Sequence, residues 1–362
     1  MLTHRHLHQI VLVVAAAMMS CSPKDASSPS PAGSRGYRMG FSGFPPRPDQ
    51  NQAVRAIQMW GTRADAAIMH LSPPWKAMLS GISPQAALQA DGVSLAEYYR
   101  NKGLKLFVTI DVTDGLNRAA EAPELVELKR SIAEPAVQVA YRQYVAAVVS
   151  LLHPDYLGLA AETNLIRLAA PRSVYDAVVS MTRAAATDVR TTSAGLPLYV
   201  SVQADAAWGR LASSSAYVGV EQDFTDFSWI TALGISSYPY FAYQDPDEIP
   251  LDYYSRLLNG RTMPCMVVEG GWTSASLGST TSSPQVQARY VRRQAQVLAN
   301  AGAIAWLQLS FTDLDLTTFP PQPAGSILPL FAHLGFVDAD LTPKLALTVW
   351  DSLFAIRRTA DR

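Results

Sequence analysis

The sequence predicts a single-domain (β/α)8 barrel that occupies residues 37–362. Two observations carry this prediction: short apolar runs alternate with helical stretches along the whole region, and most of these runs are continuously apolar. Continuous apolar runs are typical of parallel strands that are covered on both faces. The length agrees, because a barrel of this kind takes ~250 residues before insertions.

Eight of the apolar runs are expected to form strands, and seven intervening stretches are expected to form helices. The expected strands are Tyr37–Phe44, Ala66–Leu71, Leu104–Val112, Tyr156–Ala161, Leu198–Gln203, Ala232–Ser237, Cys265–Glu269 and Ala303–Leu309. The expected helices are Gln52–Trp60, Leu95–Asn101, Glu134–Leu152, Arg172–Asp188, Leu251–Leu258, Pro284–Ala301 and Leu345–Ile356. Two helices carry a proline in the first turn, Pro135 and Pro284, where its missing N–H costs nothing. The stretch 215–226 is ambiguous between a loop and a short helix.

An open, doubly wound sheet is the rival arrangement of the same elements. Such a sheet would normally bind a nucleotide through a G-x-G-x-x-G turn after its first strand. Here the first turn reads GFSGFPP over residues 40–46, which lacks that motif. Its two prolines also prevent a helix from starting immediately. The barrel is therefore the preferred architecture.

The first 36 residues are expected to lie outside the fold. Residues 1–21 are typical of a signal peptide, and the apolar run Ile10–Met19 is too short to span a bilayer as a helix. The run ends in Met-Met-Ser-Cys21, which resembles a bacterial lipoprotein signal and makes Cys21 the expected lipidation site. Residues 22–36 are rich in Ser and Pro and are expected to be a flexible tether. By the same resemblance, Ser22 permits sorting to the outer membrane; a secreted or periplasmic protein with an ordinary cleaved signal is the alternative.

Composition and motif counts argue against several classes of function. With 29 basic and 30 acidic residues, the chain lacks the basic surface that nucleic-acid binding requires. Outside the signal only His70, His153 and His333 remain, far apart, so no metal site is expected. No G-x-S-x-G elbow and no phosphate loop occur, and no cofactor is expected. Cys265 is alone once Cys21 is processed and is expected to be a small buried hydrophobe.

Two glutamates stand at the ends of expected strands. Glu162 follows the fourth strand, and Glu269 ends the seventh. In barrels of this type, functional groups lie at the carboxyl ends of the strands, and strands four and seven lie on opposite sides. Two carboxyl groups facing each other across a cleft suit glycoside cleavage, which needs an acid and a carboxylate. Repulsion between them keeps one proton on the pair.

Further polar and aromatic side chains follow the same strands and equip a carbohydrate cleft, in which aromatic faces stack on sugar rings and amides bind hydroxyls. The expected substrate contacts are His70, Trp75, Asp111, Asn164, Gln203, Tyr240, Trp272 and Trp306, and Tyr238 is expected to assist the glutamates. Each has a structural interpretation as well. The tyrosines and Trp306 suit packing, Asp111 suits a turn cap, and His70 and Gln203 suit satisfied buried positions. Trp75 and Trp272 follow strand ends and are expected to be partly exposed.

The segment GISSYPYF at 234–241 is similar to the strand-six motif of the arabinogalactan endo-β-1,4-galactanase family. The segment VVEGGW at 267–272 resembles strand seven of the clan of retaining (β/α)8 glycosidases to which that family belongs. The resemblance implies that Glu162 is the acid/base, that Glu269 is the nucleophile, and that Tyr238 hydrogen-bonds the nucleophile. It implies a retaining hydrolase of a β-linked polysaccharide or oligosaccharide.

The chain departs from that clan directly before the acid/base. Ala161 stands where clan members usually have an asparagine that contacts the sugar 2-hydroxyl. Asn164, two residues beyond Glu162, is a candidate to compensate. This departure keeps open a non-catalytic carbohydrate-binding surface lipoprotein on a degenerate barrel and, less directly, a cell-envelope scaffold protein. A tethered protein of this kind is expected to be a monomer.

Overall fold

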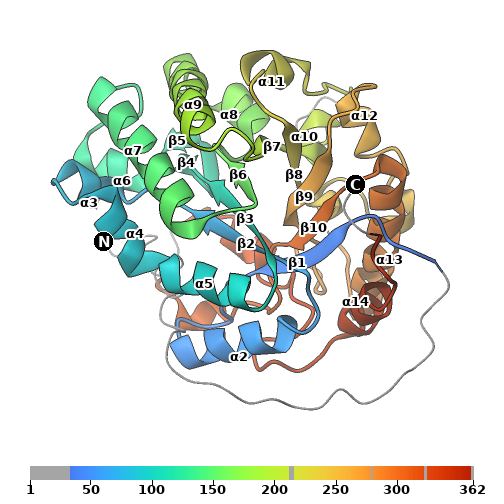
Figure 1. Cartoon of the computed structure of the whole chain (residues 1–362). Helices are drawn as coiled ribbons and strands as arrows, with labels where there is room; N and C mark the ends of the chain where they lie inside the picture. Colours follow the sequence, from blue (N-terminus) through green and yellow to red (C-terminus); the bar gives the residue numbers. More distant parts are fainter. Residues whose placement is uncertain (1–32, 212–215, 279, 322–323, 360–362) are drawn as a thin grey trace.

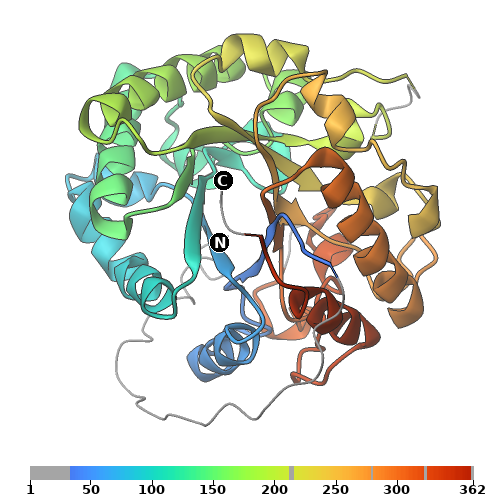
Figure 2. The ribbon, with the colours of Figure 1, turned by 45° about the vertical axis from the view of Figure 1, so that its right-hand side comes forward.

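The computed structural model describes residues 33–211, 216–278, 280–321 and 324–359. Eight parallel strands close a barrel in the order β1-β10-β9-β8-β7-β6-β3-β2. Helices surround these strands on the outside (Figures 1 and 2). This arrangement confirms the predicted single-domain (β/α)8 barrel.

All eight expected strands are present. They are β1 (Arg38–Ser42), β2 (Ala66–Leu71), β3 (Lys105–Ile110), β6 (Tyr156–Gly158), β7 (Leu198–Gln203), β8 (Ala232–Ser237), β9 (Cys265–Gly270) and β10 (Ala305–Gln308). Strand β6 is shorter than predicted, although the N–H of Leu159 still bonds the carbonyl of Tyr199 in β7. A two-stranded antiparallel hairpin, β4 (Thr113–Asp114) and β5 (Asn117–Glu121), follows β3 and was not predicted.

All seven expected helices are present as well, and several short ones were missed. The predicted helices correspond to α2 (Gln50–Trp60), α5 (Val93–Asn101), α7 (Pro135–Leu152), α9 (Arg172–Thr192), α12 (Ser255–Leu258), α13 (Pro284–Ala301) and α14 (Leu345–Phe354). The ambiguous stretch contains the short helix α11 (Glu221–Asp226). The missed helices are α3 (Trp75–Leu79), α4 (Pro84–Asp91), α6 (Pro123–Leu128), α8 (Thr163–Ala169) and α10 (Ala204–Ala207). All five have eight residues or fewer, too few to show a periodic apolar face.

A small cluster of buried side chains fills the barrel, and a larger one packs the strands against the helices. Tyr199 is the bulkiest side chain of the inner cluster. A Cβ on Gly158 or Gly234 of the adjacent strands would lie 2.5 or 2.8 Å from its ring, so both positions need glycine. The Tyr199 hydroxyl is hydrogen-bonded to the hydroxyl of Thr109 at 2.6 Å. These contacts fix the strands beneath the barrel mouth.

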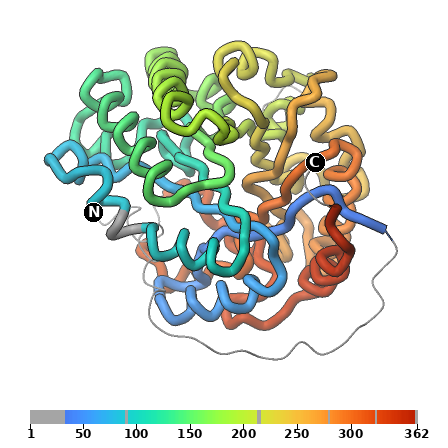
Figure 3. Tube along the Cα trace, viewed as in Figure 1, coloured from blue at the N-terminus to red at the C-terminus, as the bar shows by residue number. Residues whose placement is uncertain are grey.

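The two ends of the described chain lie together (Figure 3). Arg35 is buried, and its guanidinium bonds Asp65 at 2.8 Å and the carbonyl of Ile356 at 3.2 Å. Packed structure therefore begins slightly before residue 37. The expected signal peptide with Cys21, and residues 22–32 of the expected tether, lie outside the described residues. Within the described ranges, no helix is both long and apolar enough to cross a membrane.

Candidate active site

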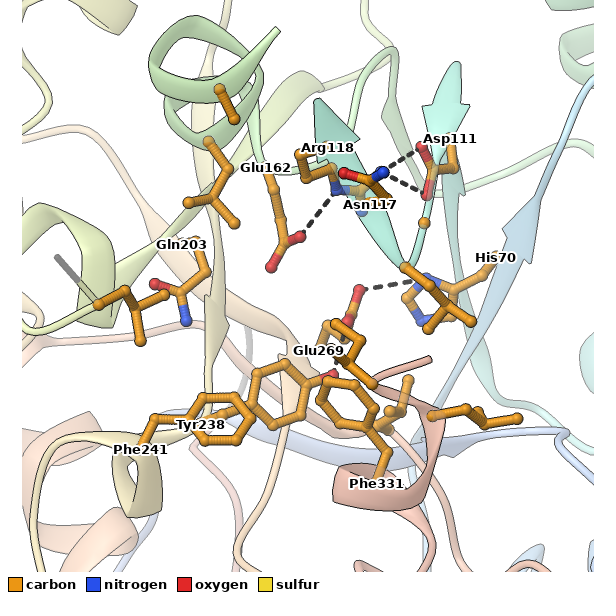
Figure 4. A pocket seen from close by; sticks show the side chains of 18 of the residues that line it. His70, Asp111, Asn117, Arg118, Glu162, Gln203, Tyr238, Phe241, Glu269 and Phe331 are labelled. Carbon is orange, nitrogen blue, oxygen red and sulfur yellow. Dashed lines mark hydrogen bonds and ion pairs between the residues drawn. The ribbon is translucent and has the colours of Figure 1, made fainter. Parts of the chain in front are cut away.

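Glu162 and Glu269 line the same pocket at the carboxyl ends of the barrel strands. The pocket has a volume of about 420 Å³. Glu162 lies four residues beyond the end of β6. Glu269 lies at the end of β9, which is three strands further round the barrel from β6. Figure 4 shows both side chains directed into the cavity. The structure thus brings together the two carboxyls that the sequence singled out.

Glu162 is held from several directions. Its backbone adopts the left-handed conformation, with φ 48° and ψ 48°, which is uncommon for a residue other than glycine. Its N–H donates to the hydroxyl of Ser201 at 2.9 Å. One carboxyl oxygen accepts from the hydroxyl of Ser236 at 2.6 Å, and the other accepts from Nε of Arg118 at 2.9 Å. The side chain is only 9% exposed, so this ion pair is largely shielded from water.

Glu269 has different neighbours. The hydroxyl of Tyr238 donates to one carboxyl oxygen at 2.5 Å, and Nδ1 of His70 lies 3.9 Å from the other. Burial, together with the negative charge of Glu162, raises the pKa of Glu269 to about 8, although Tyr238 and Arg118 act in the opposite direction. These effects favour the protonated form of Glu269 at neutral pH.

An irregularity in the pairing of β8 with β9 accompanies the orientation of Glu269. Met266 and Val268 belong to the cluster inside the barrel, so strict alternation would turn the next side chain outward. The register shifts between Ile235 and Ser236, and Ser236 lies opposite Glu269. Such irregularities re-aim side chains next to active sites. The same Ser236 binds Glu162, so one residue of β8 adjoins both glutamates.

Arg118 on β5 was not predicted as part of the site. It is 8% exposed, and its Nη1 donates to both carboxyl oxygens of Asp111, at 2.6 and 2.8 Å, while its Nε donates to Glu162. The Asp114-Gly115 pair, flanked by short runs, is a turn signal that could have revealed the hairpin. It would not have revealed that the hairpin directs Arg118 toward a glutamate 44 residues away.

Asp205 holds the backbone of Tyr238 through a hydrogen bond. Asp205 is fully buried, and one of its carboxyl oxygens accepts from the backbone N–H of Tyr238 at 2.9 Å and from the amide of Gln203 at 2.6 Å. The hydroxyl of Tyr253 donates to its other oxygen. Burial raises the pKa of Asp205, although these hydrogen bonds act to lower it. Gln203 lines the pocket as expected, but its amide is engaged by Asp205 and by the N–H of Ala206.

The other predicted contacts divide into two groups. His70 and Asp111 line the pocket. Asn164 does not face it: its side chain is buried and bonds the backbone carbonyl and N–H of Gln203 at 2.9 and 2.8 Å. Asn164 therefore ties the segment after Glu162 to the end of β7.

The expectation that Trp75 and Trp272 would be partly exposed is wrong, because they are 1% and 0% exposed. The indole N–H of Trp272 donates to Ser282 at 3.1 Å within the larger core cluster, to which Trp75 also belongs. Trp306 packs against Trp350 at 4.8 Å.

Tyr240 is also buried, and its hydroxyl donates to the carbonyl of Leu330 at 2.9 Å. Trp306 and Tyr240 thus take the packing role that was the alternative to a functional one, and the burial of Trp75 and Trp272 was not predicted.

Apolar side chains form much of the pocket wall, which the sequence analysis did not anticipate. They include Phe44, Phe241, Leu309, Leu314, Leu328 and Phe331. The rings of Phe241 and Phe331 flank that of Tyr238 at 5.8 and 4.9 Å (Figure 4). Among the described residues, no group of three or more His, Cys, Asp or Glu side chains is arranged to hold a metal ion.

No family model matches the sequence, and no curated protein matches it. Solved structures share its fold. A GH5_18 variant from Bifidobacterium longum, in complex with Manβ1-4GlcNAc, has a TM-score of 0.60 at 14% identity, over 88% of this chain and 78% of its own. An exo-β-1,4-mannosidase from an Opitutaceae bacterium gives 0.57 at 15%, over 89% and 60%. A fungal β-1,4-galactanase gives 0.52 at 13%, over 87% and 93%.

The chain spans 60% of the mannosidase and 50% and 47% of two similar β-glucuronidase chains. At such low identity these likenesses concern the fold. They show that the chain shares the (β/α)8 barrel fold of these mannosidase, glucuronidase and galactanase structures.

Proposed function

We propose that the protein is a retaining β-glycosidase in which Glu162 is the acid/base and Glu269 is the nucleophile. The observation that carries the proposal is the pair itself: two carboxyls, one after β6 and one at the end of β9, line one pocket, and the pKa of Glu269 is raised. The hydroxyl of Tyr238, donated to Glu269, stabilises the charged form that attack requires.

The proposed reaction has two steps. Glu269 attacks the anomeric carbon while Glu162 gives its proton to the departing oxygen, which leaves a covalent glycosyl ester on Glu269. Glu162 then takes a proton from water, the water oxygen attacks the same carbon, and the bond to Glu269 breaks. Two inversions give net retention of the anomeric configuration.

The ion pair with Arg118 bears on the first step. In the ligand-free site it stabilises the negative charge on Glu162, and the raised pKa of Glu269 favours the proton there. The proposed first step needs the opposite distribution. One proton transfer within the pair converts the first state into the second without net uptake of a proton.

Glu162→Gln and Glu269→Gln test the assignment. Both should lower turnover of β-linked oligosaccharides or aryl β-glycosides by about 10²–10⁴-fold or more, while the exposed Glu97→Gln should not. Azide should restore turnover to Glu269→Ala with formation of a glycosyl azide. Proton NMR of the wild-type reaction should show the β-anomer first; an α-anomer first, or full activity in Glu269→Gln, would refute the proposal.

A non-catalytic carbohydrate-binding protein is the second candidate. Two observations favour it: Ala161 precedes Glu162, and Arg118 neutralises Glu162 in the resting site. Calorimetry would show saturable oligosaccharide binding, and prolonged incubation would give no reducing ends. Cleavage that depends on both glutamates excludes this candidate.

We also propose that the chain is exported, lipidated at Cys21 and held in the cell envelope as a monomer, with the outer membrane as the expected destination. The proposal rests on residues 1–36 of the sequence. A labelled fatty acid should be incorporated into the full-length protein and not into Cys21→Ser, which should move to the soluble fraction. An unlabelled wild-type protein released by ordinary signal cleavage would support the secreted or periplasmic alternative.

A further inference from the structure

The polar groups of the pocket are concentrated around the two carboxyls and are mostly engaged by the protein. Arg118 is bound to Asp111 and Glu162, and the amide of Gln203 is bound to Asp205 and a backbone N–H. Sugar hydroxyls need donors and acceptors in place of the water they lose. Beyond the immediate surroundings of the glutamates, the polar side chains that line the pocket are those of Ser72, Asn117 and Ser310.

The exposed residues that line the pocket are mostly apolar, with Ser72 and Asn117 as the polar exceptions. Leu211 and Ile327 line it although they are 43% and 39% exposed, and the half-buried Leu116, Leu165 and Leu314 join them. These side chains come from segments far apart in the chain, so the apolar surface is assembled by the fold. Exposed apolar surface next to a cavity marks a place where a ligand or partner covers it.

The aromatic residues of the pocket also favour an apolar ligand group in its outer part. Among the described residues that line the pocket, the aromatic ones are Phe44, His70, Tyr238, Phe241 and Phe331, with no tryptophan. Leucine and isoleucine side chains offer no flat face for a sugar ring and no partner for a hydroxyl. They gain free energy by covering methylene or aryl groups.

From this geometry we infer that the site takes a β-glycoside with an apolar aglycone, an aryl or alkyl group, in place of a second sugar. The inference rests on the proposed function and narrows its substrate class. The glycone lies against Glu162 and Glu269, and the aglycone lies against Leu211, Ile327 and Phe331. A cavity of about 420 Å³ is in the range of sites that hold one small molecule.

Methyl, hexyl and phenyl β-glycosides of one sugar test this inference, with glucose, galactose, mannose and glucuronic acid as the sugars. Calorimetry with Glu269→Gln measures binding without turnover, and the wild-type protein measures cleavage. Methyl and hexyl glycosides have leaving groups of similar acidity, so a difference between them reports on contact. We expect hexyl or phenyl to bind at least about tenfold more tightly than methyl, which corresponds to about 1.4 kcal/mol. The hexyl and phenyl arms distinguish a chain from a flat ring.

Matched variants locate the contact. Ile327→Ser and Leu211→Ser should each reduce the preference for hexyl or phenyl by about threefold or more. Ile82→Ser and Leu251→Ser replace the same residue types at 49% and 46% exposure outside the pocket, and they should leave the preference unchanged.

Equal binding of methyl and hexyl glycosides by a protein that cleaves them would overturn the inference and leave the proposed function intact. A strong preference for apolar aglycones without any cleavage would support the inference about the ligand and refute the proposed catalytic function. A preference that survives both pocket variants, or no binding of any glycoside, would also overturn the inference.

Discussion

At the scale of single residues, the site depends on the different surroundings of two identical side chains. Glu162 accepts hydrogen bonds from Arg118 and Ser236, which stabilise its charge. Glu269 accepts one from Tyr238, and burial together with the charge of Glu162 raises its pKa. The sequence identified both glutamates and Tyr238 but not Arg118, whose partners are 7 and 44 residues away.

The raised pKa of Glu269 predicts a pH-dependent cost in stability. The folded protein keeps a proton that the unfolded chain releases near pH 4.5, so the free energy of unfolding should fall as pH rises from about 5 to about 8. Glu269→Gln removes this titration. It should be more stable than the wild type by roughly 1–3 kcal/mol at pH 8 and by little at pH 4.5. Urea unfolding at several pH values measures this; a constant difference between the two proteins contradicts the prediction.

Arg118→Lys tests the buried ion pair. Lysine keeps the charge but cannot make the forked contact with Asp111 and the Nε bond to Glu162 together. We expect a loss of roughly 1–3 kcal/mol of stability, and a basic limb of the pH–activity profile displaced to higher pH. Arg142→Lys, whose partner Asp188 is 42% exposed, is the control and should change stability by less than about 0.5 kcal/mol. An unchanged pH profile in Arg118→Lys would mean that Arg118 supports structure only.

At the scale of elements, strand ends and short connections aim the functional groups. The eight strands and the six predicted helices of nine residues or more were predictable because each carries a continuous or periodic apolar pattern. The hairpin β4–β5 and the short helix α8 lack such a pattern. The hairpin nevertheless positions Arg118, and α8 begins directly after Glu162. The register shift opposite Glu269 also depends on the neighbouring strand, which a local pattern does not describe.

Gly270→Ala tests the strand end that carries Glu269. Gly270 has φ 152°, and a Cβ there would lie 2.3 Å from the carbonyl oxygen of Ser237 in β8. Since neither backbone can yield, we expect a loss of about 2–3 kcal/mol in stability and about 10²-fold in kcat/KM. Gly260→Ala also has a positive φ, 78°, but meets open space, so it should cost only about 1 kcal/mol and leave activity unchanged. Equal effects of the two substitutions would contradict this account.

At the scale of the whole molecule, α14 covers the junction at which the first strand, β1, pairs with the last, β10. Trp350 on this helix is fully buried against Phe41 of β1 at 4.5 Å and Trp306 of β10 at 4.8 Å. Its indole N–H donates to the carbonyl of Arg63 at 2.9 Å. One side chain thus contacts both the first and the last strand of the barrel.

Trp350→Ala should therefore destabilise the protein by about 3–5 kcal/mol, because it leaves a large cavity at this seam. Leu345→Ala on the same helix removes a side chain that is 49% exposed and should change stability by less than about 0.5 kcal/mol. Guanidinium unfolding compares the two variants. A loss below 1 kcal/mol in Trp350→Ala would contradict the stabilising role assigned to Trp350 at this junction.

The sequence alone determined the alternation of strands and helices, and with it the (β/α)8 barrel and the position of Glu162 and Glu269 at its mouth. These features follow from local patterns, since an apolar run specifies a strand and its end specifies the rim. The tertiary structure decided which aromatic residues face the pocket. Both faces of a barrel strand are buried, so the local sequence did not reveal that Trp306 on β10 packs in the core, and it did not reveal that Trp272, just after β9, is buried as well. The tertiary structure also decided the contact of Arg118 with Glu162 and the formation of the apolar wall. Each consists of residues from segments that only the closed barrel brings together.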